Sequence, residues 1–71
     1  MYLKRLRDLR EDKDLKQKDI ADVLNIKQQQ YSLYETGKRD LPFEFAIVLA
    51  KFYNTSLDYI AGLTNNKEKY K

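Results

Sequence analysis

Residues 17–38 read QKDIADVLNIKQQQYSLYETGK, and this stretch decides the fold. Its first half predicts a helix over Gln17–Leu24, because apolar side chains recur at helical spacing and Asp19 lies in the first turn, where a carboxylate favours the helix dipole. Asn25 interrupts that helix and tolerates the left-handed backbone that a tight turn needs. The predicted buried face of this helix consists of Ile20, Ala21 and Leu24.

A second helix is predicted over Gln28–Thr36. Gly37 ends it, because glycine adopts positive φ after a helix at little steric cost. Ala21 is small enough for the two helices to cross closely at that position. Two short helices joined by a turn of about three or four residues form the helix-turn-helix layout, in which the second helix lies in the major groove of DNA.

The rest of the chain predicts further helices and no strand. Leucines at every third position predict a helix over Tyr2–Asp12. Pro42 suits the first turn of a helix over Pro42–Tyr53, and Ser56 as N-cap with Asp58 in the first turn predicts a short one over Leu57–Gly62. The expected fold class is therefore all-α, a compact five-helix bundle that contains the helix-turn-helix. We expect one domain at residues 1–64 and a polar C-terminal tail at residues 65–71.

Composition removes several kinds of chemistry. The chain has no cysteine and no histidine, which excludes disulfides, ordinary zinc sites and Cys/His or Ser/His nucleophile pairs, and its two glycines cannot form a phosphate-binding loop. We expect no enzyme, no metal and no cofactor. No apolar run reaches about 18 residues, so we expect a cytoplasmic chain without a membrane partner. The formal net charge of +3 permits a polyanionic partner without proving one.

A helical wheel sorts the side chains of the Gln28–Thr36 helix. Tyr31 and Tyr34 define its buried side, and the opposite face points to solvent. A glutamine amide on that face matches the N6 donor and N7 acceptor of adenine in the major groove. An exposed glutamine is more often only solvated, but the turn, the tyrosines and Gly37 in register favour base contacts. The candidates for base contacts are Gln28, Gln29, Ser32 and Leu33.

Gln30 falls on neither face, and a different role is expected for it. With Lys27 as the residue that caps the helix, Gln30 stands three positions later, where its side chain reaches back to the backbone N–H of Lys27 as in a capping box. We expect Gln30 to be structural.

The stretch over residues 17–38 also resembles the Xre and lambdoid phage repressor/Cro family of helix-turn-helix regulators. The resemblance continues through LPFEFAIVLAKFYNTSLDYIAG at residues 41–62 and covers nearly the whole chain. Lys16 and Lys27 depart from the Ser or Thr usual before these helices, and Asn25 replaces the frequent turn glycine. The matching positions are Gln17, Ala21, Ile26, Ser32, Glu35 and Gly37.

The resemblance implies a lambda-repressor-like DNA-binding domain. It implies that Arg10 and Glu35 form a structural ion pair across the domain, and that Gln17 contacts the DNA backbone. Surface cations near the same helices are further candidates for contacts with the DNA backbone, although each alone is more often an ordinary surface residue. The expected phosphate contacts are Gln17, Lys18, Lys27, Thr36, Lys38 and Arg39.

The helix over Pro42–Tyr53 is apolar on more sides than one small core requires. A second copy of the chain is the expected cover, although most of these residues would also serve to fill the domain's own core. A dimer would place two reading helices about 34 Å apart on a palindromic site. The expected interface residues are Val48, Leu57, Ile60, Ala61 and Leu63.

The expected function is that of a sequence-specific DNA-binding transcriptional regulator. The family resemblance suggests a repressor that binds its operator as a homodimer, without a small-molecule ligand domain. The alternative is a protein-interaction module, such as an antitoxin-like or anti-repressor partner. Such a module would bind double-stranded DNA only in the non-specific range of about 10⁻⁴ to 10⁻⁶ M.

Overall fold

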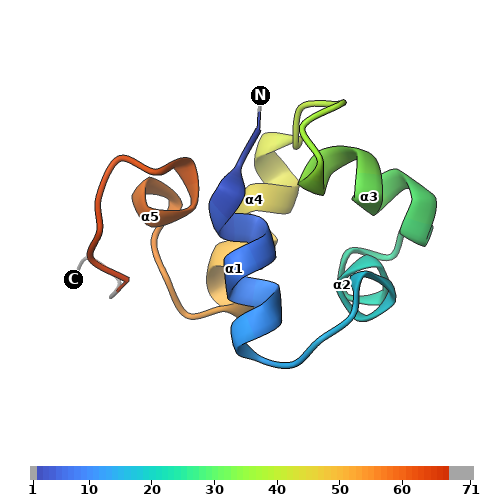
Figure 1. Ribbon diagram of the computed structural model, residues 1–71, viewed down its shortest axis with the longest axis horizontal. Helices are drawn as coiled ribbons and strands as arrows, with labels where there is room; N and C mark the ends of the chain where they lie inside the picture. Colours follow the sequence, from blue (N-terminus) through green and yellow to red (C-terminus); the bar gives the residue numbers. More distant parts are fainter. Residues whose placement is uncertain (1, 68–71) are drawn as a thin grey trace.

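The computed structural model describes residues 2–67, and the regular structure in that range is entirely helical. The five helices are α1 (Lys4–Asp12), α2 (Gln17–Leu24), α3 (Gln28–Glu35), α4 (Phe43–Phe52) and α5 (Leu57–Ala61). No strand occurs among the described residues, and the all-α bundle is confirmed. In Figure 1, α1 crosses the middle of the molecule, with α2 and α3 on one side, α5 on the other and α4 behind it.

Five helix ends differ slightly from the prediction, and two of them do so because Tyr53 follows α4 and Gly62 follows α5 as C-caps. α1 begins two residues later, at Lys4 instead of Tyr2. Pro42 precedes α4 instead of lying in its first turn, because its ψ of 144° is an extended value. α3 ends at Glu35, and Thr36 follows as its C-cap. Each shift is short and leaves the helical faces unchanged.

The turn between α2 and α3 has the predicted backbone. Asn25 is left-handed, with φ 57° and ψ 45°. The backbone N–H of Ile26 donates to the carbonyl of Ala21 at 2.9 Å, which satisfies one of the orphan acceptors at the end of α2. At the other end of α2, the backbone N–H of Lys16 donates to the carboxylate of Asp19 at 2.8 Å. Both ends of α2 are therefore fixed by local hydrogen bonds.

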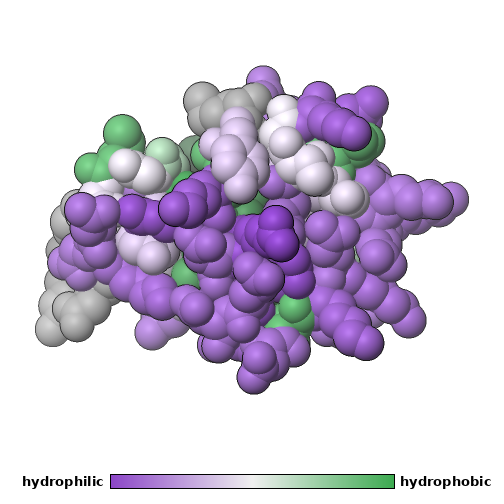
Figure 2. All heavy atoms as spheres, viewed as in Figure 1, coloured by the Kyte–Doolittle hydropathy of each residue, from purple (hydrophilic) through white to green (hydrophobic). Residues whose placement is uncertain are grey.

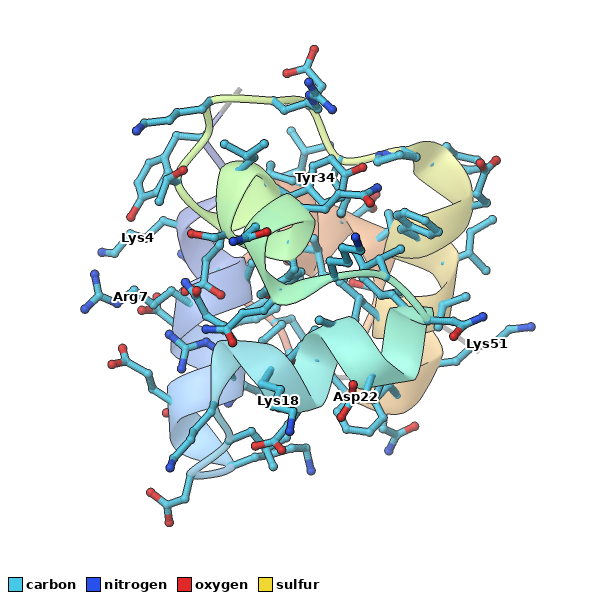
Figure 3. The ribbon with its side chains drawn as sticks, turned by 90° about the vertical axis from the view of Figure 1, so that its right-hand side faces the viewer. Lys4, Arg7, Lys18, Asp22, Tyr34 and Lys51 are labelled. Carbon is cyan, nitrogen blue, oxygen red and sulfur yellow. The ribbon has the colours of Figure 1, made fainter. Side chains whose placement is uncertain are left out.

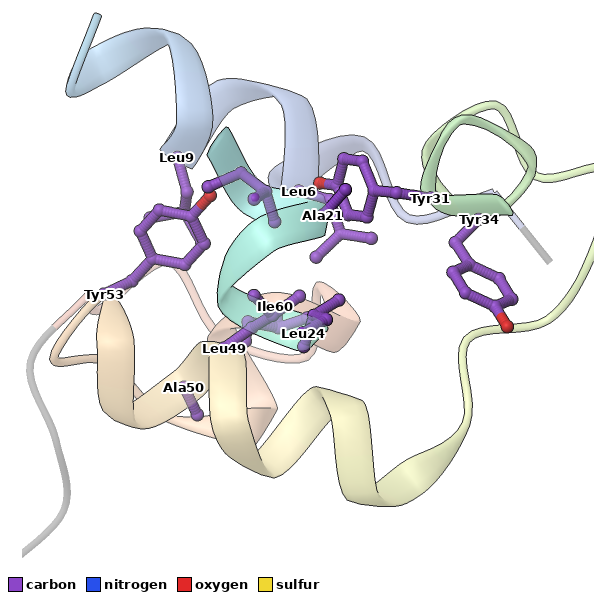
Figure 4. Close-up of a cluster of buried hydrophobic side chains, with 11 residues drawn as sticks. Leu6, Leu9, Ala21, Leu24, Tyr31, Tyr34, Leu49, Ala50, Tyr53 and Ile60 are labelled. Carbon is purple, nitrogen blue, oxygen red and sulfur yellow. The ribbon is translucent and has the colours of Figure 1, made fainter. Parts of the chain in front are cut away.

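The core joins all five helices and includes two tyrosines of α3. Tyr31 is fully buried beside Leu6 and Ala21 (Figure 4), and the Tyr34 ring meets Phe45 of α4 edge to face at 6.1 Å. Aromatic pairs of this kind add about 0.5–1.5 kcal/mol beyond area burial. The buried core residues are Leu6, Leu9, Ile20, Ala21, Leu24, Tyr31, Tyr34, Leu49, Ala50, Tyr53 and Ile60.

The segment after α5 returns to α1. The Arg5 guanidinium lies 4.0 Å from the Tyr59 ring centroid, and it donates to the Thr64 carbonyl and the Asn65 side-chain oxygen, both at 2.8 Å. Lys67 forms an ion pair with Asp12 at 3.1 Å. The part of the expected tail that the structure describes is thus held against the domain, and residues 68–71 lie outside the described residues.

None of the helices within residues 2–67 has both the length and the apolar character needed to cross a bilayer.

Candidate nucleic-acid interface

The orientation of α3 is as predicted. Tyr31 is 0% exposed and Tyr34 is 4% exposed, whereas Gln28 and Gln29 are exposed. The two rings fix the rotation of α3 about its axis, because turning either ring outward would remove it from the core. The amides at the start of α3 therefore face solvent.

The exposed amides border an open groove of about 540 Å³ between α2 and α3. Gln17 lines this groove from the start of α2, and Gln28, Gln29 and Ser32 line it from α3. Figure 3 shows the two helices side by side, with Lys18 projecting from α2. Of the predicted base-contact residues, Leu33 does not line the groove and is half-buried. We call the surface formed by Gln17, Gln28, Gln29 and Ser32 the reading groove.

The predicted capping contact of Gln30 with Lys27 is replaced by another. The side-chain nitrogen of Gln30 donates to the Tyr34 hydroxyl at 2.8 Å, four residues further along the same helix. This contact satisfies the polar end of a tyrosine whose ring is buried. Gln30 is structural, as expected, but with a different partner.

Arg10 and Glu35 form a two-bond ion pair. Arg10 Nε donates to Glu35 Oε2 at 3.0 Å, and Nη2 donates to Oε1 at 2.8 Å. Arg10 Nη1 also donates to the Leu15 carbonyl at 2.9 Å. Gln17 adds a longer hydrogen bond to Glu35 Oε1 at 3.3 Å. One carboxylate therefore connects α1, the start of α2 and the end of α3.

The charges of this pair are stabilised by each other. Burial acts to raise the pKa of Glu35, but hydrogen bonds, chiefly from Arg10 and also from Gln17, outweigh it and hold that pKa below 4.5. The hydrogen bond to Glu35 raises the pKa of Arg10. Burial, followed by the nearby negative charge of Glu35, raises the pKa of the Tyr53 hydroxyl, which has no hydrogen-bond partner within residues 2–67. Near neutral pH the site holds a charged pair beside neutral tyrosines.

The predicted phosphate contacts divide into two groups. The four cations among them, Lys18, Lys27, Lys38 and Arg39, have exposed side chains that are available to DNA. Thr36 differs, because its hydroxyl already donates to the Ser32 carbonyl at 2.8 Å. A phosphate oxygen only accepts hydrogen bonds, so it would have to displace this one.

Two residues that the sequence did not single out lie next to the reading groove. Tyr2 and Arg7 line a second, polar cleft of about 390 Å³. Arg7 stands three positions before Arg10, so the helical period places both on one side of α1, and the Arg10–Glu35 pair turns that side toward α3. This spacing was the available signal. The full lining of this second cleft is Tyr2, Arg7, Arg10, Gln17, Glu35 and Thr36.

The predicted dimer residues do not form one surface. Ile60 is only 3% exposed and belongs mainly to the core, whereas Leu63 is 79% exposed. Val48 is exposed but lies about 140° around α4 from Phe43, at 100° per residue. In Figure 2, apolar atoms gather on the edge of the molecule where α5 lies. An apolar groove there is lined by Leu3, Leu41, Phe43, Ala46, Leu57, Ile60 and Ala61.

Five short helices, a left-handed turn after α2 and an outward polar face on α3 define a helix-turn-helix protein. Residues 6–60 match the helix-turn-helix family, and the chain belongs to it, in the Xre/Cro/C1 type. The predicted family is therefore confirmed.

Proteins similar to this chain include bacterial and phage regulators. The chain is 35% identical over 68 residues to the uncharacterized HTH-type transcriptional regulator YobD of Bacillus subtilis (strain 168), covering 96% of this chain and 61% of YobD. It is 33% identical over 73 residues to the cryptic phage CTXphi transcriptional repressor RstR of Vibrio cholerae, covering 100% of this chain and 66% of RstR. This chain spans less than two thirds of the length of either relative. No solved structure matches the chain at a significant level.

Proposed function

We propose that the protein is a sequence-specific DNA-binding transcriptional regulator that represses by occupying its operator. The observation that carries this proposal is the rotation of α3, which buries Tyr31 and Tyr34 and leaves Gln28 and Gln29 exposed in an open groove. The similarity to RstR, a phage transcriptional repressor, supports repression as the direction of regulation.

In this proposal α3 lies in the major groove and reads base edges. Gln28 and Gln29 each present a donor and an acceptor to an adenine, and a good bidentate pair discriminates by about 1–3 kcal/mol. Ser32 lies on the same groove and contacts a base edge or a phosphate. Leu33, which is half-buried, contributes the part of its side chain that remains accessible to a thymine methyl group.

Phosphate contacts hold α3 in register without reading sequence. Gln17 donates one amide hydrogen to Glu35, and the second hydrogen of the same amide remains for a phosphate. Lys18, Lys27, Lys38 and Arg39 supply positive charge around the same helices.

The protein acts as a homodimer on a palindromic operator. The apolar groove beside α5 receives a projecting side chain of a second copy, and Leu63, two residues beyond Ala61 of the groove, is a suitable projection. A groove and a projection on the same surface are what a two-fold interface requires, because each copy then offers both. Leu57, Ile60 and Ala61 line this groove and stay in the proposed interface.

Selection of bound sequences from random duplex DNA, repeated at two salt concentrations, tests this function. We expect a palindromic motif whose half-sites lie about 34 Å apart, as two symmetry-related α3 helices require. A library that shows no enrichment, with affinity in the non-specific range of about 10⁻⁴ to 10⁻⁶ M, would reject the regulator. The alternative function, binding of a different protein at the α5 groove, would then be favoured, because Phe43 and Leu63 are strongly exposed there.

A further inference from the structure

We propose that the second cleft, lined by Tyr2, Arg7, Arg10, Gln17, Glu35 and Thr36, binds a backbone phosphate of the DNA, with Arg7 as the residue that supplies the charge. This inference rests on the proposed function, because it assigns one more contact to the same complex. It places α1, which carries none of the expected DNA contacts, at the DNA backbone.

The second cleft lies directly beside the reading groove. Gln17 lines both the reading groove and the second cleft, so the two are adjacent at the start of α2. Figure 3 shows Arg7 and Lys4 projecting from α1 at one edge of the face that presents α2 and α3. A duplex whose major groove receives α3 presents its phosphates beside the groove, at the level of this edge.

The lining of the second cleft carries more positive than negative charge. Its only lining carboxylate is that of Glu35, which already accepts two hydrogen bonds from Arg10 and one from Gln17. The Arg10–Glu35 pair is therefore neutral as a unit, and Arg7, whose partner Glu11 does not line the cleft, supplies the remaining positive charge of the lining. A single phosphodiester charge matches that excess.

Arg7 is exposed and available to a new partner. Its partner is Glu11 on the same helix, with Arg7 Nε 3.4 Å from Glu11 Oε1, and both side chains are exposed. Exposed pairs of this spacing contribute little to stability, so Arg7 gives up the contact readily. An arginine also presents a planar fork that matches two phosphate oxygens.

The walls of the cleft supply further donors and a fixed edge. Gln17 and Lys18 open α2, and the backbone N–H groups of a first helical turn have no acceptor within the helix. Tyr2 closes the cleft against the loop after α3, because Gly37 allows a close approach: a Cβ at Gly37 would lie 2.9 Å from Tyr2 Cα. At about 30 Å³ per water, a space of about 390 Å³ holds on the order of ten waters, enough for a phosphate with its sugar.

The test is the salt dependence of binding to a random-sequence duplex between 50 and 200 mM salt. In a plot of the logarithm of the binding constant against the logarithm of salt concentration, each phosphate contact contributes roughly 0.9 to the slope, and removing the contact removes that contribution. We expect Arg7→Gln to bind severalfold more weakly at low salt and to reduce the slope by about 1. Arg7→Lys should keep most of the slope, because it keeps the charge. Lys51→Gln, an exposed cation at the opposite edge in Figure 3, is the matched control and should leave the slope unchanged.

The outcomes separate this inference from the function on which it rests. A wild-type protein that shows no salt-dependent binding to duplex DNA overturns both. A wild-type protein that binds with a steep slope, together with an Arg7→Gln variant of the same slope, overturns the phosphate site alone. Because Arg7 is exposed, thermal unfolding of Arg7→Gln should match that of the wild type, and the binding readout then reports on the contact.

Discussion

Arg10 of α1 and Glu35 of α3 form a fork in which two nitrogens meet two oxygens, and the pair is shielded, with side chains 14% and 3% exposed. Because Gln17 of α2 also donates to Glu35, the pair fixes α2 and α3 relative to α1. The geometry of the proposed interface therefore depends on one buried carboxylate.

Removing Arg10 should strongly destabilise the fold. Arg10→Ala leaves Glu35 buried without its main partner, a change that costs about 3–5 kcal/mol in other proteins. Urea denaturation should show that loss, and the double variant Arg10→Met/Glu35→Leu should recover much of it, because neither charge then remains. A loss below about 1 kcal/mol in Arg10→Ala would show that the pair is not structurally important.

Acid should weaken the protein through Glu35. Burial acts to raise the pKa of Glu35, but hydrogen bonds, chiefly from Arg10, hold it below 4.5 in the folded state, so the unfolded chain takes up this proton first as pH falls. The stabilisation is present above about pH 4.5 and is lost as pH falls through the folded pKa. The stability difference between wild type and Glu35→Gln, measured by denaturant titration, should be largest near neutral pH and shrink below pH 4.5. A difference that does not change with pH would contradict this.

Two buried tyrosines should respond differently to removal of their hydroxyl groups. Tyr53→Phe should be neutral or stabilising, because the hydroxyl is buried and has no hydrogen-bond partner within residues 2–67. Tyr34→Phe should cost about 1 kcal/mol, because it removes the acceptor of Gln30. Thermal unfolding of the two variants measures this difference in stability. A larger loss of stability in Tyr53→Phe than in Tyr34→Phe would contradict the prediction.

The dimer should depend on the α5 surface and not on the outer side of α4. Leu63→Asp places a charge on the proposed projecting side chain without disturbing the core, since Leu63 is exposed. Sedimentation equilibrium should show a shift toward monomer for Leu63→Asp and no shift for the matched variant Val48→Asp, which lies outside the groove. A shift in Val48→Asp alone would move the interface to the other side of α4.

Helical period explains what could be predicted from the sequence. The spacing of Tyr31 and Tyr34 determines which side of α3 is buried, and Asn25 and Gly37 mark turns through their backbone preferences. The first two helices follow from the same period, whereas Gly37, Pro42 and Ser56 mark the ends or starts of the others. The Arg10–Glu35 pair lies 25 positions apart, and only resemblance to a family pointed to it.

Other features depend on packing that a local pattern does not contain. Gln30 had two polar groups within one helical turn, the backbone of Lys27 and the hydroxyl of Tyr34, and only the side-chain geometry decides between them. Ile60 and Ala61 are adjacent apolar residues in a five-residue helix, so the sequence does not rank their burial. In the sequence, Arg7 does not differ from any other solvated cation on a helix. The contact between α1 and α3 is what places it in the second cleft.

The central claim is that the amides of Gln28 and Gln29 read bases. Its most direct test is the affinity of Gln28→Ala and Gln29→Ala for the selected operator and for a scrambled duplex at the same salt, with Gln30→Ala as the matched control. We expect each of the first two to lose about 1–3 kcal/mol on the operator and almost nothing on scrambled DNA, while Gln30→Ala discriminates as the wild type does. Equal losses on both duplexes would contradict base reading by α3.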